Sequence, residues 1–184
     1  MLVTVDIGNT NITIGIFDKD ELIGTYRLTT KVRRTSDEYG FMLKNFLDRS
    51  NVHEKQIEAV IVSSVVPKVM HSFTNGIKKF VGIEPLIVGP GIKSGISVQL
   101  ENPRNVGADR IADCAGAFSE HGGPILVADF GTATTYDYVD ENGCFKAGAI
   151  GVGIETGANA LWGQTAQLPE IEIKRPKTIL ARNT

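Results

Sequence analysis

The sequence has few of the residues that build metal-binding, redox-active or membrane-spanning proteins. It contains two cysteines, Cys114 and Cys144, and their separation matches no redox or metal-binding spacing. No apolar run approaches the ~20 residues that a membrane helix needs. The first residues show no basic segment followed by an apolar segment and a cleavage site. We therefore expect a cytoplasmic protein with no membrane partner.

Charge of one sign is not in excess either. The 19 lysines and arginines against 21 aspartates and glutamates give a net charge of -2, which argues against bulk nucleic-acid binding. The histidines, His53, His71 and His121, are scattered singly, so we assign none of them to a metal or to catalysis. The hydrophobic share of 42% and charged share of 22% are ordinary for a globular protein of one large or two small domains.

Residues 2–17 form the stretch around which the rest of the chain is organised. An apolar run ends at Asp6, breaks at Gly8 and becomes β-branched again, which predicts a strand, a tight turn and a second strand. Gly8 would let the backbone approach a ligand closely, and the amides of residues 9–11 can point at phosphate oxygens. Asp6 is placed to hold Mg²⁺, directly or through its waters. A plain hairpin would explain the same pattern.

The same pattern occurs a second time in residues 125–136. There an apolar run ends at Asp129, and Gly131 and small hydroxyl residues follow. Acidic turns containing Asp18 and Asp140 come next, one residue sooner in the second copy. A long internal repeat means duplicated halves. Two such turns facing each other across a cleft would hold a nucleotide from both sides, which weakens the hairpin explanation.

Five short motifs stand in order along the chain: residues 6–10 (DIGNT), 63–67 (SSVVP), 102–103 (NP), 106–111 (VGADRI) and 129–135 (DFGTATT). Together they resemble the motif set of type III pantothenate kinase, a family of the actin, sugar-kinase and heat-shock ATPase superfamily. The resemblance implies an α/β fold of two duplicated actin-like (ribonuclease H-like) domains, each with a mixed five-stranded sheet. Family members continue beyond the length of this chain, so we expect the second domain to be incomplete.

We expect an N-terminal domain over residues 1–121 and a truncated C-terminal domain over residues 122–184. Thr35 and Glu38 form a capping-box pattern that predicts a helix start. Pro67 suits the first turn of another helix, ending at Gly82. Leu22 is expected on the same strand face as Tyr26 and Leu28. The remaining expectations are strands at residues 21–28, 57–62, 85–88, 125–129, 132–139 and 144–150, helices at 107–118 and 154–168, and an extended loop from 170.

The resemblance implies a kinase that transfers phosphate from ATP to pantothenate, giving 4′-phosphopantothenate in the first step towards coenzyme A. Asp6 would hold Mg²⁺ through water, and Asp129 would bind a monovalent cation, K⁺ or NH₄⁺. The residues implied in ATP and phosphate binding are Asp6, Ile7, Gly8, Asn9, Thr10, Asn11, Ile12, Thr13 and Thr132.

Asp109 lies in the first turn of a predicted helix, where the helix dipole and free amides favour an anion. This pattern alone fits a carboxylate that only stabilises the helix end. The resemblance implies instead a general base that takes the proton from the acceptor hydroxyl. Arg110 could pair with a carboxylate or with charge developing at the phosphoryl group. The residues implied in acceptor binding are Leu100, Gly107, Ala108, Asp109, Arg110 and Thr184.

Other functions stay open. Leu100 stands where the family usually has a tyrosine, so one acceptor contact would be missing. A nucleotide-binding regulatory protein that keeps the fold but turns over poorly would fit this change. A sugar kinase or polyphosphate hydrolase of the same superfamily is a third possibility, against which residues 107–110 argue. A homodimer is implied by the resemblance alone.

Overall fold

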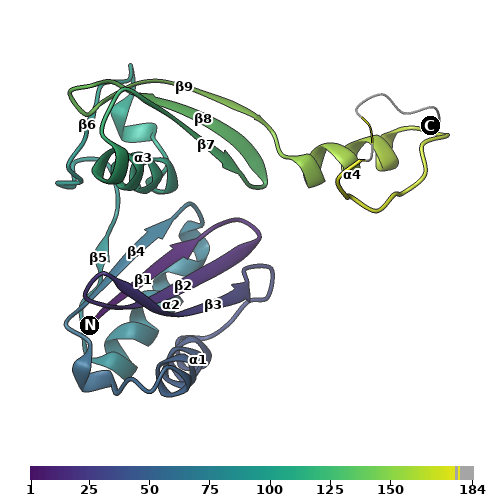
Figure 1. Ribbon diagram of the computed structural model, residues 1–184. Helices are drawn as coiled ribbons and strands as arrows, with labels where there is room; N and C mark the ends of the chain where they lie inside the picture. Colours follow the sequence, from purple (N-terminus) through teal and green to yellow (C-terminus); the bar gives the residue numbers. More distant parts are fainter. Residues whose placement is uncertain (177, 179–184) are drawn as a thin grey trace.

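The structure is a computed structural model that describes residues 1–176 and 178. Its strands form two mixed sheets, in the orders β3-β2-β1-β4-β5 and β6-β9-β8-β7, one above the other in Figure 1. The α/β architecture with an incomplete second sheet is therefore confirmed. The elements are β1 Leu2–Ile7, β2 Asn11–Asp18, β3 Glu21–Thr29, α1 Ser36–Arg49, η1 Glu54–Gln56, β4 Ala59–Ser64, α2 Pro67–Val81, β5 Leu86–Ile87, β6 Ser97–Val98, η2 Pro103–Asn105, α3 Ala108–His121, β7 Ile125–Phe130, β8 Ala133–Val139, β9 Cys144–Val152 and α4 Ile154–Gln164.

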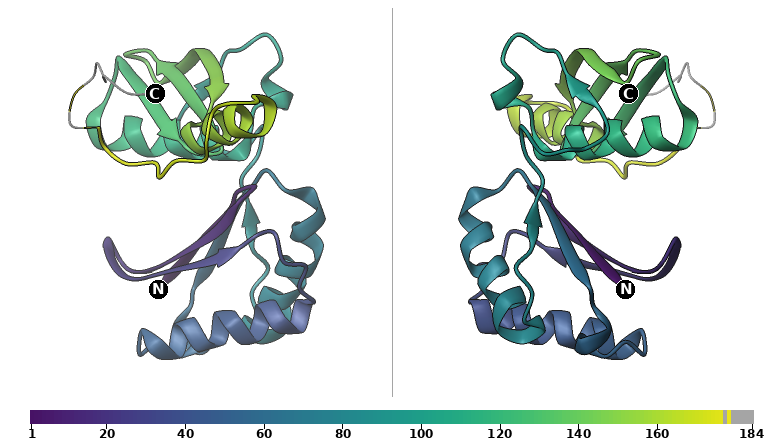
Figure 2. Two further views of the ribbon diagram at one scale, coloured as in Figure 1. Left: turned by 90° about the vertical axis from the view of Figure 1, so that its right-hand side faces the viewer. Right: turned by 90° about the vertical axis from the view of Figure 1, so that its left-hand side faces the viewer.

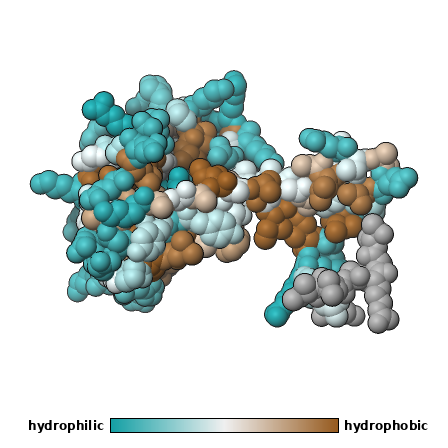
Figure 3. Space-filling view, turned by 90° about the horizontal axis from the view of Figure 1, so that it is seen from above, coloured by the Kyte–Doolittle hydropathy of each residue, from teal (hydrophilic) through white to brown (hydrophobic). Residues whose placement is uncertain are grey.

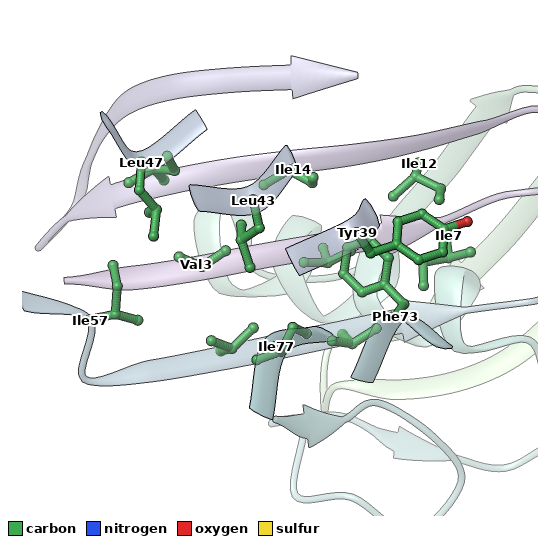
Figure 4. Close-up of a cluster of buried hydrophobic side chains, with 14 of the residues drawn as sticks. Val3, Ile7, Ile12, Ile14, Tyr39, Leu43, Leu47, Ile57, Phe73 and Ile77 are labelled. Atoms are coloured by element: carbon green, nitrogen blue, oxygen red, sulfur yellow. The ribbon is translucent and has the colours of Figure 1, made fainter. Parts of the chain in front are cut away.

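The first core lies between one face of the first sheet and two helices. Strand β1 pairs antiparallel with β2 and parallel with β4, and alternate side chains of each strand point to the same face. Helices α1 and α2 cover that face, so Tyr39, Leu43 and Phe73 meet the strands in Figure 4. Figure 2 shows both helices under one face of the sheet. The inward-facing residues of β1 and β2 are Val3, Val5, Ile7, Ile12, Ile14 and Ile16.

The two helix starts expected from the sequence are confirmed. The Thr35 hydroxyl accepts the Glu38 backbone N–H at 3.3 Å, and the Glu38 carboxylate accepts the Thr35 backbone N–H at 2.7 Å. This reciprocal pair caps α1. Helix α2 begins at Pro67 and ends before Gly82, whose φ of 79° is the left-handed conformation that favours glycine after a helix.

The expectation for Leu22 is wrong. The pairing of β2 with β3 shifts register between Ile16 and Phe17, which marks a β-bulge. One extra residue reverses the direction of every side chain beyond it. Leu22 consequently lies on the opposite face from Tyr26, beside Phe17 and Gly15, and is 51% exposed.

The second unit repeats the three-stranded part of the first. Strands β7, β8 and β9 form an antiparallel meander, as β1, β2 and β3 do. Asp129 pairs with Thr135 as Asp6 pairs with Thr13. The sequence did not predict β6, which adds to β9 in parallel.

A second core forms where α3 packs against this sheet. Its buried members include Ile111 and Cys114 of α3 and Phe145 of β9. Strand β6 and α3 both precede residue 122, yet they contribute to the second sheet and the second core. Helix α3 also contacts β4 of the first sheet. The division between residues 121 and 122 stays a prediction.

The end of the described chain extends away from both sheets. Strand β9 runs two residues further than expected, to Val152, and α4 ends at Gln164, before the predicted end near Pro169. Figures 1 and 3 show α4 as a projection with hydrophobic surface, to which Ile154 and Leu161 contribute at 62% and 54% exposure. Within the described residues, no helix combines the length and the apolar character needed to cross a membrane.

Candidate active site

The two repeated turns meet. The hydroxyl groups of Thr10 and Thr132 lie 3.0 Å apart and share a hydrogen bond across 122 residues of sequence. Three residues separate β1 from β2, and two separate β7 from β8. The one-residue difference between the sequence repeats therefore lies in the turns themselves. Gly8 donates its N–H to the Asn11 carbonyl at 2.9 Å, which closes the longer turn.

Thr30, immediately after β3, holds the first turn from behind. Its backbone N–H donates to the Thr10 carbonyl at 2.9 Å, and its hydroxyl donates to the Gly8 carbonyl at 2.8 Å. These two hydrogen bonds anchor the backbone of the turn to the end of β3. Thr30 was not predicted from the sequence, because no local pattern marks a hydroxyl that bonds a turn 20 residues earlier.

The residues implied in phosphate binding fall into two groups. Ile7 and Ile12 are fully buried in the first core, so only their backbone groups are available to a ligand. Asn9, Thr10 and Asn11 are at least partly exposed on the turn. Thr13 pairs with Asp6 across the strands, on the face that points away from the core.

Asp6 lies at the end of β1 beside a buried hydroxyl. Ser63 of β4 pairs with Asp6 in the sheet and is 7% exposed. Among the residues that the structure describes, its hydroxyl has no partner within hydrogen-bonding geometry, although it lies close enough to Asp6 to lower the carboxyl pKa. The effect of burial is larger than the effect of Ser63, so the pKa of Asp6 is raised. The charges of Asp109 and Asp129 raise this pKa further. Both side chains line a largely apolar cavity of about 360 Å³ on the open face of the first sheet.

Helix α3 presents two carboxylates to the turns. Asp109 and Asp113 are four residues apart, which puts them on one helix face. Burial and the charges of Asp129, Asp109 and Asp6 raise the pKa of Asp113 to about 6. Asp113 was not predicted, although its spacing from Asp109 was visible in the sequence. Without a bound cation, this side of the site has an excess of negative charge.

Local geometry fixes Asp109 at the start of α3. Gly107 is the N-cap residue, and a Cβ at that position would collide with the Asp109 carboxylate. The Arg110 backbone N–H donates to Asp109 Oδ1 at 2.8 Å. Among the described residues, the second carboxylate oxygen accepts no hydrogen bond, so it is available to an acceptor hydroxyl.

The other residues implied in acceptor binding have different surroundings. The Arg110 guanidinium pairs with Asp137 of β8, Ala108 is buried, and Leu100 packs against the second core. Thr184, with its neighbours Arg182 and Asn183, lies outside the described residues.

The oxygen atoms of the site suit hard cations. In the part of the chain that the structure describes, no three His, Cys, Asp or Glu side chains form a metal cage. Mg²⁺ does not need one, because it binds through one or two carboxylates, water and substrate phosphates. Asp6 with the unpartnered Ser63 hydroxyl fits that requirement. Asp129 beside the carbonyls of the second turn is a reasonable donor set for a larger monovalent cation.

Asp113 gives the first prediction. Its folded-state pKa of about 6 lies above the ordinary value of 3.8, so the folded protein binds this proton more tightly than the unfolded chain. The contribution of Asp113 to stability therefore falls as the pH rises from about 4 to 6. We expect Asp113→Asn to raise Tm at pH 8, with a gain that shrinks towards pH 4. Thermal unfolding at pH 8, 6 and 4, with Asp20→Asn as an exposed control, measures this. A gain independent of pH would contradict it.

Solved structures share this fold. The chain aligns with a Baf family transcriptional activator protein from Campylobacter jejuni with a TM-score of 0.53 and 19% identity, covering 90% of this chain and 62% of that one. It also aligns with a 2-dehydro-3-deoxygalactonokinase protein from Sinorhizobium meliloti with a TM-score of 0.51 and 9% identity, covering 90% and 58%. Two mixed sheets, each containing the repeated strand–turn–strand unit, define the class as α/β proteins with an actin-like fold.

Sequence comparison resolves the family within that class. The sequence model of the type III pantothenate kinase family matches residues 2–184. A Bifidobacterium longum subsp. infantis protein of that name is 58% identical over the whole chain, which spans 72% of the relative. The Agathobacter rectalis and Listeria welshimeri proteins of that name are 52% and 44% identical, with 71% of each covered. The chain belongs to the type III pantothenate kinase family.

Proposed function

We propose that this chain catalyses the ATP-dependent phosphorylation of pantothenate to 4′-phosphopantothenate, the first step of coenzyme A biosynthesis. The observation that carries the proposal is the hydrogen bond between Thr10 and Thr132, because it brings the two repeated turns to one point. Phosphoryl transfer needs mainly positioning and charge stabilisation, which two opposed turns can supply. The name of the curated relatives supports pantothenate as the acceptor.

ATP would bind with its β- and γ-phosphates between the turns. Residues 7–13 would surround them from the first domain, chiefly through the backbone amides of the Gly8 turn, and Thr132 would approach from the second. The hydrogen bond between Thr10 and Thr132 would give way to the phosphates. Asp6 would hold Mg²⁺ through water, and Asp129 would hold K⁺ or NH₄⁺. When bound, these cations would offset phosphate charge and the carboxylates of the site.

Pantothenate would lie against the first turn of α3. Asp109 would accept the proton of the acceptor hydroxyl through its free carboxylate oxygen, so that the hydroxyl oxygen attacks the γ-phosphorus while ADP leaves. Gly107, Ala108 and Arg110 would form the adjoining wall. Leu100 and Thr184 complete the predicted set of acceptor-binding residues. We also propose that the protein is a homodimer in the cytoplasm.

ADP release with MgATP and pantothenate, with and without K⁺, tests the function. We expect turnover that requires pantothenate and is raised by K⁺. Equal ADP release without pantothenate would contradict the proposal and favour a hydrolase. Nucleotide binding without pantothenate-dependent ADP release would favour the regulatory alternative. A screen of sugars as acceptors supplies the matched comparison.

A further inference from the structure

One buried ion pair joins Arg110, at the start of α3, to Asp137 of the second sheet. Arg110 follows Asp109 on α3, and Asp137 lies in the middle of β8. Arg110 Nε donates to both carboxylate oxygens of Asp137, with the nitrogen 3.0 Å from each oxygen, and Nη2 also donates to Oδ1. The side chains are 15% and 2% exposed. Such a two-point contact fixes the orientation of the guanidinium as well as its position.

The surroundings leave little room for another arrangement. The guanidinium carbon lies 5.4 Å from the centre of the Phe145 ring on β9. A Cβ at Gly148, also on β9, would collide with both Arg110 Nη2 and Asp137 Oδ1. The hydrogen bond to Asp137 raises the pKa of Arg110. Burial raises the pKa of the neighbouring Cys114 thiol to about 12, so that thiol stays neutral.

The pair is connected to the proposed base through one peptide unit. While the Arg110 side chain binds Asp137, the Arg110 backbone N–H donates to Asp109 Oδ1 at 2.8 Å. Movement of Arg110 would therefore displace the carboxylate. The net contribution of a buried ion pair to folding stability is often small, whereas a displacement of about 1 Å in an active site can cost about 10²-fold in rate.

We propose that Asp137 is a positioning residue, which acts through Arg110 to hold Asp109 in place for proton transfer. Gly148 is the third member, because it provides the space that the pair occupies. Through this pair, Arg110 fixes the start of α3 to the second sheet. This inference rests on the proposed function.

The main test compares Asp137→Asn with Asp37→Asn. Asp37 forms an exposed ion pair with Lys79 at 2.7 Å, in the first unit, and serves as the matched control. We expect Asp137→Asn to lower kcat by about 10- to 100-fold, with KM for pantothenate and Kd for ATP within about threefold of the unmodified values. Asp37→Asn should leave all three constants unchanged.

Two kinetic outcomes would overturn the inference. A tenfold or greater rise in KM with kcat retained, for Asp137→Asn or Arg110→Lys, would mean that Arg110 binds the acceptor. An unchanged kcat per folded molecule would leave the pair a purely structural role. If Asp137→Asn fails to fold because Arg110 is left buried and unpaired, Asp137→Asn combined with Arg110→Gln removes both charges and should show the same loss of kcat.

Hydrogen exchange of residues 107–112 tests the positioning without turnover. The Arg110 amide should exchange at least about tenfold faster in Asp137→Asn and at the unmodified rate in Asp37→Asn. Unchanged exchange in both variants would contradict the inference even if the enzyme is active. The unmodified chain could instead prove inactive while Asp137→Asn still shows the expected faster exchange. That result would count against the proposed function and not against the positioning role of Asp137.

Discussion

Asp109→Asn should lower kcat by ~10²–10⁴-fold and leave the Kd for ATP within about twofold. That range is the usual contribution of a positioned general base, and it corresponds to about 2.7–5.5 kcal/mol of activation free energy. Asparagine keeps the shape of the side chain, and its carbonyl oxygen can still accept the Arg110 N–H. It cannot take a proton. The change therefore removes the chemistry while the start of α3 stays formed.

Single-turnover phosphorylation of pantothenate, with ATP binding measured separately by calorimetry, checks this expectation. Asp20→Asn, in the exposed turn between β2 and β3, is the matched control and should behave as the unmodified chain. If Asp109→Asn retains more than a tenth of kcat, Asp109 is not the base. It would then be a carboxylate that only stabilises the N-terminus of α3, the alternative that the sequence left open.

Phe73→Ala should cost about 3–5 kcal/mol of unfolding free energy. Phe73 is 1% exposed and lies 4.9 Å from the Tyr39 ring, between α1, α2 and the first sheet (Figure 4). Truncating a buried aromatic side chain loses its transfer free energy and leaves a cavity. Because native domains are stable by about 5–15 kcal/mol, this single change would remove a large fraction of the total.

Urea unfolding followed by circular dichroism measures the loss. Phe41→Ala is the control, because Phe41 is 60% exposed and makes an edge contact with the Phe80 ring. It should cost no more than about 1.5 kcal/mol. Similar losses in the two variants would show that the first core is not packed around Phe73. At low urea concentration, each folded molecule of Phe73→Ala should still turn over normally, the reverse of the result expected for Asp109→Asn.

Local patterns in the sequence were enough to predict most of the elements. The apolar and β-branched runs of β1 and β2, the Thr35–Glu38 capping box and the Pro67 helix start depend on residues within a few positions of one another. The repeated Asp-x-Gly turns were equally visible. Together with the ordered motifs, they led to the family that the comparisons bear out.

Local patterns failed where partners lie far apart in the chain. The bulge that turns Leu22 outward depends on how β3 pairs with β2. The pairing of β6 with β9 joins residues more than 40 positions apart. No pattern within either strand specified these neighbours.

The sequence by itself determined the duplicated strand-and-turn units and the residue types of the candidate site. Only the tertiary structure decided that Thr10 meets Thr132, that Asp113 joins the carboxylates of the site, and that Arg110 is held by Asp137. The physical reason is the same in each case. Hydrogen bonds, burial and charge coupling depend on distances in space, and these are set when the two sheets and α3 pack together.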